Sequence, residues 1–338
     1  MRDFLTERPN LNGATILVTG GTGSFGKAMI HHLLENFEPR RVIIFSRDEM
    51  KQWEMSFDPK FRDRRNLRYF IGDVRDLGRL EMAMRGVDYV IHTAALKHVP
   101  AAEYNPFECI RTNVHGAENV VQASIRTGVK RVIALSTDKA ANPINLYGAS
   151  KLASDKIFVA ANHLAGSSET RFSVVRYGNV IGSRGSIVPL FRKLVAEGTD
   201  HLPITDERMT RFWITLVQGV RFVLSSFAIM RGGEIFVPKL PSMKVTDVAR
   251  AIAPGLPLKM IGMRPGEKLH EIMITREDSF NTLELPDRYV IEPAFIMWSA
   301  TRSELPGASK VAEGFHYSSD DNVEWLSKTE LDQMLVGS

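Results

Sequence analysis

Short runs of β-branched and aliphatic residues recur along the first half of the chain, and the stretches between them are long enough for amphipathic helices. These runs occupy residues 15–18, 42–45, 90–91, 132–135 and 173–175. Strands that are apolar along their whole length are typical of a parallel sheet covered on both faces. Since parallel strands are joined by right-handed crossovers, the pattern predicts an α/β fold with a doubly wound, Rossmann-type parallel sheet. Such a sheet binds its ligands at the carboxyl ends of its strands.

The pattern changes after about residue 180, where segments punctuated by Gly and Pro replace the regular spacing. We therefore expect a Rossmann domain followed by a smaller C-terminal substrate-binding cap. The boundaries are 12–180 for the Rossmann domain, rejoined by about 210–239, and 181–209 with 240–338 for the cap and tail. The apolar run at 220–230 is too short to cross a membrane and predicts a packing helix. The tail has no clear period, which indicates irregular structure or a partner-facing extension.

The composition is that of a globular protein: 44% of the 338 residues are hydrophobic and 24% are charged, which excludes disordered and fibrous classes. The single cysteine, Cys109, excludes an intramolecular disulfide framework and a zinc site built from cysteines. Residues 1–9 lack the apolar core of a signal peptide, and no apolar run is long enough to span a bilayer. We therefore expect a reduced, cytoplasmic protein with no membrane partner.

Charge and histidine content favour neither a nucleic acid nor a metal. The 43 Lys and Arg residues exceed the 39 Asp and Glu residues by only four, and the basic run at 62–68 lacks interleaved aromatic residues. The nine histidines show no metal-ligand spacing. We expect His92, His98 and His115 to be interior or rim groups rather than ligands.

A glycine-rich turn follows the first predicted strand and precedes a helical segment. Gly20, Gly23 and Gly26 are spaced three residues apart, a variant of the dinucleotide-binding fingerprint. Glycine lets the backbone turn sharply and approach a pyrophosphate, which then lies on the amides of the helix N-terminus. This turn, with its residues Thr22, Ser24 and Phe25, is predicted to bind a dinucleotide.

The second predicted strand ends where the adenosine ribose of such a cofactor should lie, with Ser46, Arg47 and then Lys51 one helical turn later. A hydroxyl, a guanidinium and an ammonium suit a 2′-phosphate, so NADP is favoured over NAD. Asp48 is close by, and the alternative is a solvated, basic helix start.

Three more loops at the same sheet edge complete the predicted cofactor site. Asp73 and Val74 follow the third strand, which lies between the runs 42–45 and 90–91, and they are expected at the adenine edge. Thr93 and Lys97 follow the fourth strand and are expected near the pyrophosphate and the nicotinamide ribose.

Tyr147 and Lys151 are four residues apart in a predicted helix and so share one helix face. A nearby ammonium, reinforced by an oxidised nicotinamide, favours the phenolate and should lower the tyrosine pKa toward neutrality. Such a tyrosine takes the proton of an alcohol while the alcohol carbon loses hydride. After the fifth strand of a dinucleotide fold, this pair resembles the active site of the extended short-chain dehydrogenase/reductase superfamily.

Asp138 and Lys139, next to Thr137, provide an acid and a base beside that pair. Members of the superfamily that dehydrate nucleotide sugars with retention at C5 have Thr-Asp-Glu here. Oxidation at C4 acidifies the C5 proton; a base removes it while an acid protonates the departing C6 hydroxyl. Asp138 is the natural acid, and Lys139 acts as the base only if its pKa is depressed, a shift we expect from Lys151 and the nicotinamide cation. The alternative is a helix-capping aspartate beside a solvated lysine.

Several runs of the chain resemble the inverting UDP-N-acetylglucosamine 4,6-dehydratases. The resemblance spans about residues 12–275 and lies in the runs 19–26, 45–51, 72–76, 94–100, 136–151, 173–180, 209–214, 233–239 and 264–271. A sister group that also epimerises C3 has methionine in place of Tyr147. The resemblance implies conversion of UDP-N-acetylglucosamine to UDP-2-acetamido-2,6-dideoxy-β-L-arabino-hexos-4-ulose and water, as the first step toward pseudaminic acid on flagellins.

The same resemblance implies further site residues and an assembly. NADP is held through the cycle, and the chain forms a homo-oligomer, either a dimer or a hexamer. Substrate contacts are expected from Thr137 and Asn179, with Val180 near the nicotinamide. Lys97 reaches either cofactor or sugar. On chemical grounds Arg211 and Arg264 suit the UDP diphosphate, because guanidinium matches phosphate bidentately, and the sequence leaves open which of them reaches it.

Three alternatives remain open at this stage. A nucleotide-sugar 4-epimerase needs Tyr147 and Lys151 but neither Asp138 nor Lys139. A reductase of the same superfamily would consume or accumulate NADPH. A non-catalytic protein that senses NADP would keep the fold and lose the chemistry.

Overall fold

The central sheet of the computed structural model is largely parallel, as the apolar runs predict. The model describes residues 2–4, 7–183, 185–295 and 305–336. Seven strands are mutually parallel, in the order β3 (Leu67–Ile71), β2 (Arg41–Ser46), β1 (Thr15–Thr19), β4 (Tyr89–His92), β5 (Arg131–Thr137), β6 (Arg171–Tyr177) and β10 (Ile235–Pro238). The doubly wound α/β prediction is therefore confirmed, and the chain returns to the sheet at β10.

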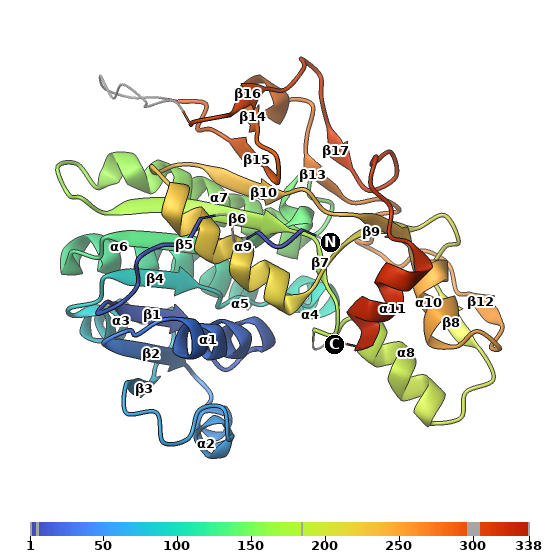
Figure 1. Ribbon diagram of the computed structural model, residues 1–338, viewed down its shortest axis with the longest axis horizontal. Helices are drawn as coiled ribbons and strands as arrows, with labels where there is room; N and C mark the ends of the chain where they lie inside the picture. The colour runs from blue at the N-terminus through green and yellow to red at the C-terminus, as the bar shows by residue number, and fades with distance from the viewer. Residues whose placement is uncertain (1, 5–6, 184, 296–304, 337–338) are drawn as a thin grey trace.

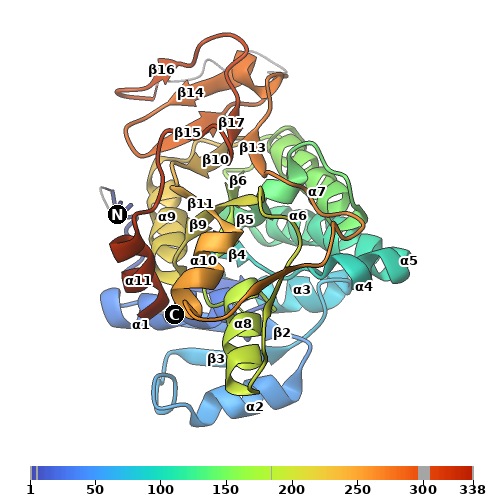
Figure 2. The ribbon, with the colours of Figure 1, turned by 90° about the vertical axis from the view of Figure 1, so that its right-hand side faces the viewer.

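Helices cover both faces of this sheet (Figures 1 and 2). One face carries α1 (Ser24–Asn36) and α9 (Leu216–Ile229); the other carries α3 (Leu77–Met84), α6 (Gly116–Thr127) and α7 (Leu146–Leu164). Shorter elements lie along the crossovers: α2 (Glu49–Phe57), α4 (Val99–Tyr104), α5 (Pro106–Ile110), η1 (Arg111–His115) and η2 (Asp138–Ala140). The predicted packing helix is α9, and its buried residues join the main core.

Polar side chains fix where the helices begin. Asn145 precedes α7 and accepts a hydrogen bond from the Gly148 amide at 2.7 Å. Thr215 and Gln218 form a reciprocal capping box at the start of α9. Because these side chains satisfy amides that have no partner within the helix, they set the first turn of each helix.

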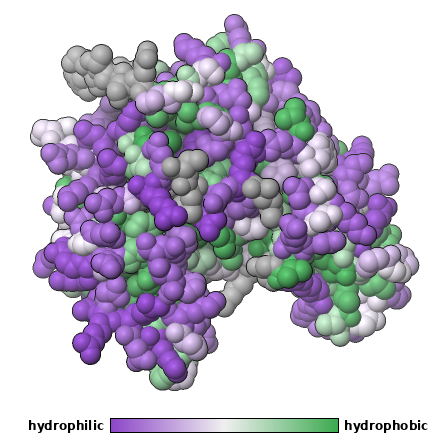
Figure 3. All heavy atoms as spheres, viewed as in Figure 1, coloured by the Kyte–Doolittle hydropathy of each residue, from purple (hydrophilic) through white to green (hydrophobic). Residues whose placement is uncertain are grey.

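The cap lies beyond the carboxyl ends of the parallel strands, at the right of Figure 1. It contains a three-stranded sheet of β7 (Asn179–Val180), β9 (Thr210–Ile214) and β11 (Ser242–Lys244), and a pair of β8 (Leu202–Ile204) with β12 (Leu258–Met260). Around them pack α8 (Ile187–Ala196), α10 (Val245–Ile252) and α11 (Lys328–Val336). Figure 3 shows the surface indented between this cap and the body of the sheet.

The tail differs from the expected irregular extension. After β13 (Ile272–Ile274) and η3 (Asp278–Asn281), the strands β14 (Thr282–Glu284), β15 (Arg288–Ile291) and β16 (Ser309–Lys310) extend the central sheet, with β15 antiparallel to β10. The predicted cap and tail at 240–338 thus contributes to both layers, and its residues 296–304 and 337–338 lie outside the described ranges. β17 (Tyr317–Ser318) pairs with β13, and the Tyr317 hydroxyl donates to the Leu240 carbonyl at 2.9 Å. These contacts hold the tail on the domain, and the hydrophobic pattern of the sequence does not reveal them.

None of the helices in the described ranges is both long enough and apolar enough to cross a membrane.

Candidate active site

The loops that follow β1, β2, β3, β4, β5 and β6 all emerge at one edge of the sheet, because these strands are parallel. That edge faces the cap, and the residues singled out from the sequence for cofactor or substrate lie at the carboxyl ends of these strands, on the loops and helices that follow them, or in the cap.

The glycine turn after β1 is closely packed. A β-carbon at Gly26 would lie 2.6 Å from the Gly20 carbonyl oxygen and 2.6 Å from the Gly21 Cα, so only glycine allows this approach. Thr22 is buried, and its hydroxyl lies 3.0 Å from the Ser46 hydroxyl. Phe25 stacks on Tyr177, with ring centroids 6.0 Å apart. Gly23 precedes α1, which begins at Ser24, so the turn presents a helix N-terminus that fits a pyrophosphate.

The basic residues after β2 have acidic partners. Asp48 caps α2 by accepting from the Lys51 amide at 3.0 Å, and it also pairs with the Lys51 ammonium. The Arg47 guanidinium lies 3.7 Å from Asp73, and its side chain is 52% exposed. Ser46 is buried at the end of the strand. A half-exposed guanidinium and a buried hydroxyl thus lie next to each other at the end of β2.

The other predicted cofactor residues lie on neighbouring loops. Thr93 donates to the Thr19 carbonyl oxygen at 2.6 Å, which ties the β4 loop to the glycine turn. Val74 is buried, and its carbonyl oxygen accepts from the Asn119 amide at 3.0 Å. Lys97 is exposed at the rim.

Tyr147 and Lys151 lie on the first turns of α7, whose start packs against Lys139. A β-carbon at Gly148 would lie only 2.2 Å from the Lys139 carbonyl oxygen. This contact places Tyr147 beside Lys139. Burial raises the Tyr147 pKa to about 12, although the Lys139 ammonium opposes that shift. The expected low tyrosine pKa is therefore wrong for the protein without bound ligands, and the cation that acts on Tyr147 is Lys139.

Lys151 is 3% exposed, and burial lowers its pKa while Asp155 opposes the shift. Asp155 accepts from Ser136 at 2.8 Å and from the Arg176 guanidinium at 3.2 Å. These buried ionic groups underlie the active-site helix and connect it to β5 and β6.

Asp138 and Lys139 form an ion pair at the end of β5, with the ammonium 3.1 Å from Asp138 Oδ1. The Thr137 hydroxyl donates to the same carboxylate oxygen at 2.8 Å. Asp138 is 1% exposed, whereas 27% of the Lys139 side chain is exposed. The alternative of a capping aspartate beside a solvated lysine does not describe this pair, because Thr137 is the residue that caps η2.

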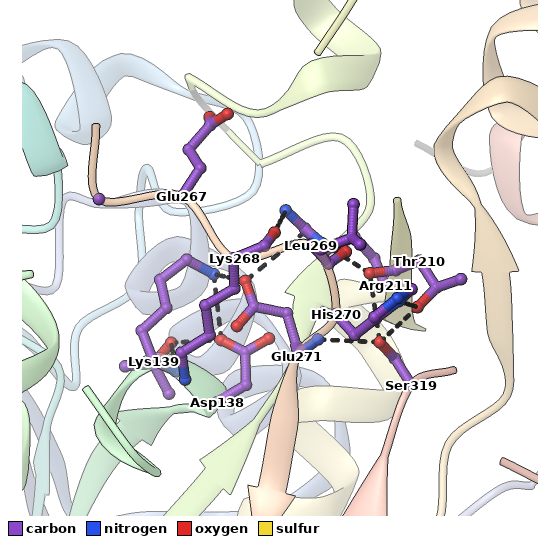
Figure 4. Close-up of polar contacts among 12 residues, drawn as sticks. Asp138, Lys139, Thr210, Arg211, Glu267, Lys268, Leu269, His270, Glu271 and Ser319 are labelled. Carbon is purple, nitrogen blue, oxygen red and sulfur yellow. Dashed lines mark hydrogen bonds and ion pairs between the residues drawn. The ribbon is translucent and has the colours of Figure 1, made fainter. Parts of the chain in front are cut away.

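Glu271 completes this cluster and was missed from the sequence. Its Oε1 lies 3.0 Å from the Lys139 ammonium, which also contacts Asp138 (Figure 4). Burial lowers the Lys139 pKa, but the carboxylates of Asp138 and Glu271 outweigh burial and raise it above its ordinary value. The expected depression of the Lys139 pKa is therefore wrong for the unliganded protein. The only sequence signal for Glu271 was its place in the 264–271 run.

The two candidate diphosphate ligands lie in different surroundings. Arg211 is buried in β9 and donates to the carbonyl oxygens of Thr210, Lys268 and Leu269 at 2.6, 2.9 and 3.0 Å. Arg264 is exposed and pairs with Glu267.

The segment that carries Arg264 lies across the acid–base loop. The Asn145 side chain donates to the Gly266 carbonyl oxygen at 2.8 Å, and the Lys268 ammonium donates to the Ala141 carbonyl oxygen at 2.6 Å. These contacts hold the 264–271 segment over residues 138–147.

Asn179 and Val180 form β7, parallel to β9 and half-buried. They lie between the central sheet and the cap.

The histidines and the cysteine have structural surroundings. His92 is buried, with Nδ1 2.9 Å from the Thr19 hydroxyl, while His98 and His115 are at the rim. Cys109 is buried in α5. Within the described ranges, no group of three or more His, Cys, Asp and Glu residues is placed to hold a metal.

The family model described as "Polysaccharide biosynthesis protein" matches residues 16–293. An inverting UDP-N-acetylglucosamine 4,6-dehydratase of Campylobacter jejuni (strain 81-176) is 60% identical over 95% of this chain and 96% of its own. A UDP-glucose 4-epimerase of Rickettsia canadensis is 40% identical over 95% of each chain.

Two solved structures share the fold. Pen from Bacillus thuringiensis has a TM-score of 0.88 and 37% identity, covering 97% of this chain and 98% of its own. DesIV from Streptomyces venezuelae, a dTDP-glucose 4,6-dehydratase with NAD bound, has a TM-score of 0.67 and 25% identity, covering 75% and 86%.

Proposed function

The chain belongs to the polysaccharide biosynthesis proteins of the extended short-chain dehydrogenase/reductase superfamily, and we propose that it is an inverting UDP-N-acetylglucosamine 4,6-dehydratase. The observation that carries the proposal is the Asp138–Lys139 pair, 3.1 Å apart and next to Tyr147. An epimerase needs only the tyrosine and Lys151. A buried acid in contact with an amine is what elimination of water requires in addition.

The reaction starts at Tyr147, which accepts the proton of the sugar C4 hydroxyl. A bound nicotinamide cofactor supplies hydride acceptance at C4 and hydride return at C6. The Lys139 ammonium stabilises the phenolate, as its effect on the Tyr147 pKa indicates. Lys151, buried on the same helix face, adds a second cationic group.

Dehydration then uses the acid–base pair. Lys139 in its amine form removes the C5 proton, which the C4 ketone has made acidic. Asp138 in its carboxylic acid form protonates the C6 oxygen, which leaves as water. Both forms arise from the resting ion pair by transfer of one proton across the 3.1 Å contact, so no external acid or base is needed.

NADP is the cofactor we propose, held by the glycine turn with Ser46 and Arg47 at the 2′-phosphate. The exposure of Arg47 and the burial of Ser46 beside Thr22 support this assignment. The Lys51 ammonium provides a second cation for the 2′-phosphate when it separates from the Asp48 carboxylate. The close packing at Gly26 leaves the backbone amides of the turn accessible to a pyrophosphate.

For the UDP diphosphate we propose Arg264 rather than Arg211. The Arg211 guanidinium is committed to three backbone carbonyl oxygens, whereas Arg264 is exposed and, among the described residues, pairs only with Glu267. Asn179, Thr137 and Lys97 are proposed as contacts to the sugar.

Incubation of the protein with UDP-N-acetylglucosamine in deuterium oxide tests the function. Mass spectrometry should show loss of one water and one deuterium at C5, while NADPH absorbance stays constant. Lys139→Met should abolish product, and the exposed Lys193→Met serves as the matched control. Steady NADPH change would instead indicate a reductase; a 4-epimer formed equally by Lys139→Met would indicate an epimerase; NADP binding without turnover would indicate a sensor.

We further propose that the product enters pseudaminic acid biosynthesis for flagellin glycosylation, that the enzyme is a cytoplasmic lyase, and that it assembles as a dimer or hexamer. The identity to the Campylobacter enzyme over nearly the whole chain supports the shared reaction.

A further inference from the structure

Glu271 is held in place by its backbone before its side chain reaches the active site. Its amide donates to the Ser319 hydroxyl at 2.9 Å, and its carbonyl oxygen accepts from the Ser319 amide at 2.9 Å. The residue is 1% exposed. The carboxylate therefore points at Lys139 from a fixed base, as Figure 4 shows.

Each of the two carboxylates at Lys139 uses one oxygen for the ammonium and leaves the other unpaired. Asp138 Oδ2 and Glu271 Oε2 are buried and have no hydrogen-bond partner among the described residues. A buried carboxylate oxygen without a partner costs free energy in a structural role. Both carboxylates that contact the Lys139 amine have such an oxygen, which indicates a reactive site rather than a structural one.

The groups that face Lys139 come from four elements. Asp138 is its neighbour on η2, Glu271 and Lys268 come from the segment before β13, Arg211 from β9 and Tyr147 from α7. Arg211 Nε lies 3.6 Å from the same Glu271 oxygen that contacts Lys139. Glu271 is therefore shared between two cations, and only one of them, Lys139, is next to the acid.

We propose that Glu271 is a positioning residue for the dehydration step: it directs the Lys139 nitrogen toward Asp138 and stabilises the ammonium that forms there. The inference rests on the proposed function. In the step, the Lys139 amine takes the C5 proton, and the C5–H electron pair forms the C5–C6 double bond. The C6–O bond breaks, and the oxygen takes the Asp138 proton to leave as water. Lys139 ends as ammonium and Asp138 as carboxylate.

The pH profile of the reaction separates this role from a structural one. The Asp138–Lys139 pair is active when the two groups together hold one transferable proton. Activity therefore falls at both lower and higher pH, and the pH profile is bell-shaped. The negative charge of Glu271 stabilises the Lys139 ammonium and so raises the alkaline limit of that bell.

The experiment compares holoenzyme variants by mass spectrometry of product across pH. E271Q should move the alkaline limb of the kcat profile to lower pH by about one unit and lower the maximum about tenfold, with KM unchanged. E271D keeps the charge but shortens the reach, so it should keep the limbs of the wild-type profile at a lower kcat. The exposed Glu277→Gln, six residues further along, is the matched control and should match wild type.

A folded E271Q whose profile superimposes on that of wild type would overturn the proposal. Should E271Q fail to fold, E271D decides: the proposal stands if kcat falls at constant KM and fails if kcat is unchanged. Absence of dehydration in the wild-type enzyme would instead refute the proposed function.

Discussion

Gly148 packs directly on Lys139: a β-carbon at Gly148 would lie 2.2 Å from the Lys139 carbonyl oxygen. The start of α7 and the acid–base loop therefore touch through backbone atoms. Because this contact has no flexible side chain to yield, it sets where Tyr147 lies relative to Lys139.

Gly148→Ala should displace α7 from the acid–base loop and lower kcat by about 100-fold, since a displacement of about 1 Å at reacting groups has effects of that size. Kinetics of product formation, with circular dichroism to verify folding, checks this. Gly78→Ala is the control, because its nearest contact would be the Asp76 carboxylate at 3.6 Å. Equal kcat values for the two variants would contradict the assignment.

Arg47→Ala should weaken NADP binding by about 10- to 100-fold and leave NAD binding unchanged. The reason is that the lost guanidinium contact is to the 2′-phosphate, which NAD lacks. Titration of both dinucleotides into protein stripped of cofactor measures this. The matched control is Arg62→Ala, on an exposed loop. A parallel loss of affinity for NADP and NAD would assign Arg47 to another part of the cofactor.

Arg264→Ala should raise KM for the nucleotide sugar about tenfold and leave the melting temperature unchanged, since its side chain is 62% exposed and its one ion pair within the described part of the chain is with Glu267. Steady-state kinetics and thermal melting measure the two effects. Arg250→Ala, another exposed arginine with an acidic neighbour three residues away, provides the comparison. An unchanged KM would contradict this assignment and favour Arg211 as the diphosphate ligand.

Arg211→Ala should instead destabilise the protein by about 1–3 kcal/mol, because it leaves buried carbonyl oxygens without their donor and removes one of the two cations at the Glu271 carboxylate. Urea unfolding at neutral pH measures the loss. A variant as stable as wild type would show that Arg211 is not a structural anchor.

His92 should make stability fall as pH decreases. Burial, assisted by Lys151, lowers its pKa from 6.5 to about 3. Because the folded state resists protonation, the contribution of His92 is complete above pH 6.5 and is lost as pH falls toward 3.

Between pH 7 and 5 the loss from His92 should be about 2 kcal/mol. Comparing urea unfolding of wild type with His92→Gln isolates it, since the variant should lack this component of the slope. His115→Gln, at an exposed position, should retain it. Identical slopes for wild type and His92→Gln would show that another group titrates.

Much of the Rossmann layer was predictable because its signals are local. The apolar runs predicted β1, β2, β4, β5 and β6, and the apolar segment near residue 220 predicted α9. The glycine spacing after β1 predicted a tight turn, which the close packing at Gly26 confirms. In each case the backbone requirement is expressed within a few residues.

Two pKa predictions were wrong for the unliganded protein, one because of a charge distant in sequence and the other because of burial. The Lys139 pKa is raised rather than depressed, since Glu271 reaches the ammonium from the far side of the cap segment. Tyr147 has a raised pKa because burial exceeds the effect of the nearby cation. The sheet strands of the tail, β14 and β15, are short and have no period that sequence reasoning can detect.

The sequence by itself determined the parallel sheet, the glycine turn and the i, i+4 pairing of Tyr147 with Lys151, because each depends on neighbours along the chain. Only the tertiary structure decided the direction of the Lys139 pKa shift and the different surroundings of Arg211 and Arg264. Burial and Coulomb energy depend on distances in space, and the fold brings Glu271 within 3.0 Å of a lysine 132 positions earlier in the chain (271 − 139).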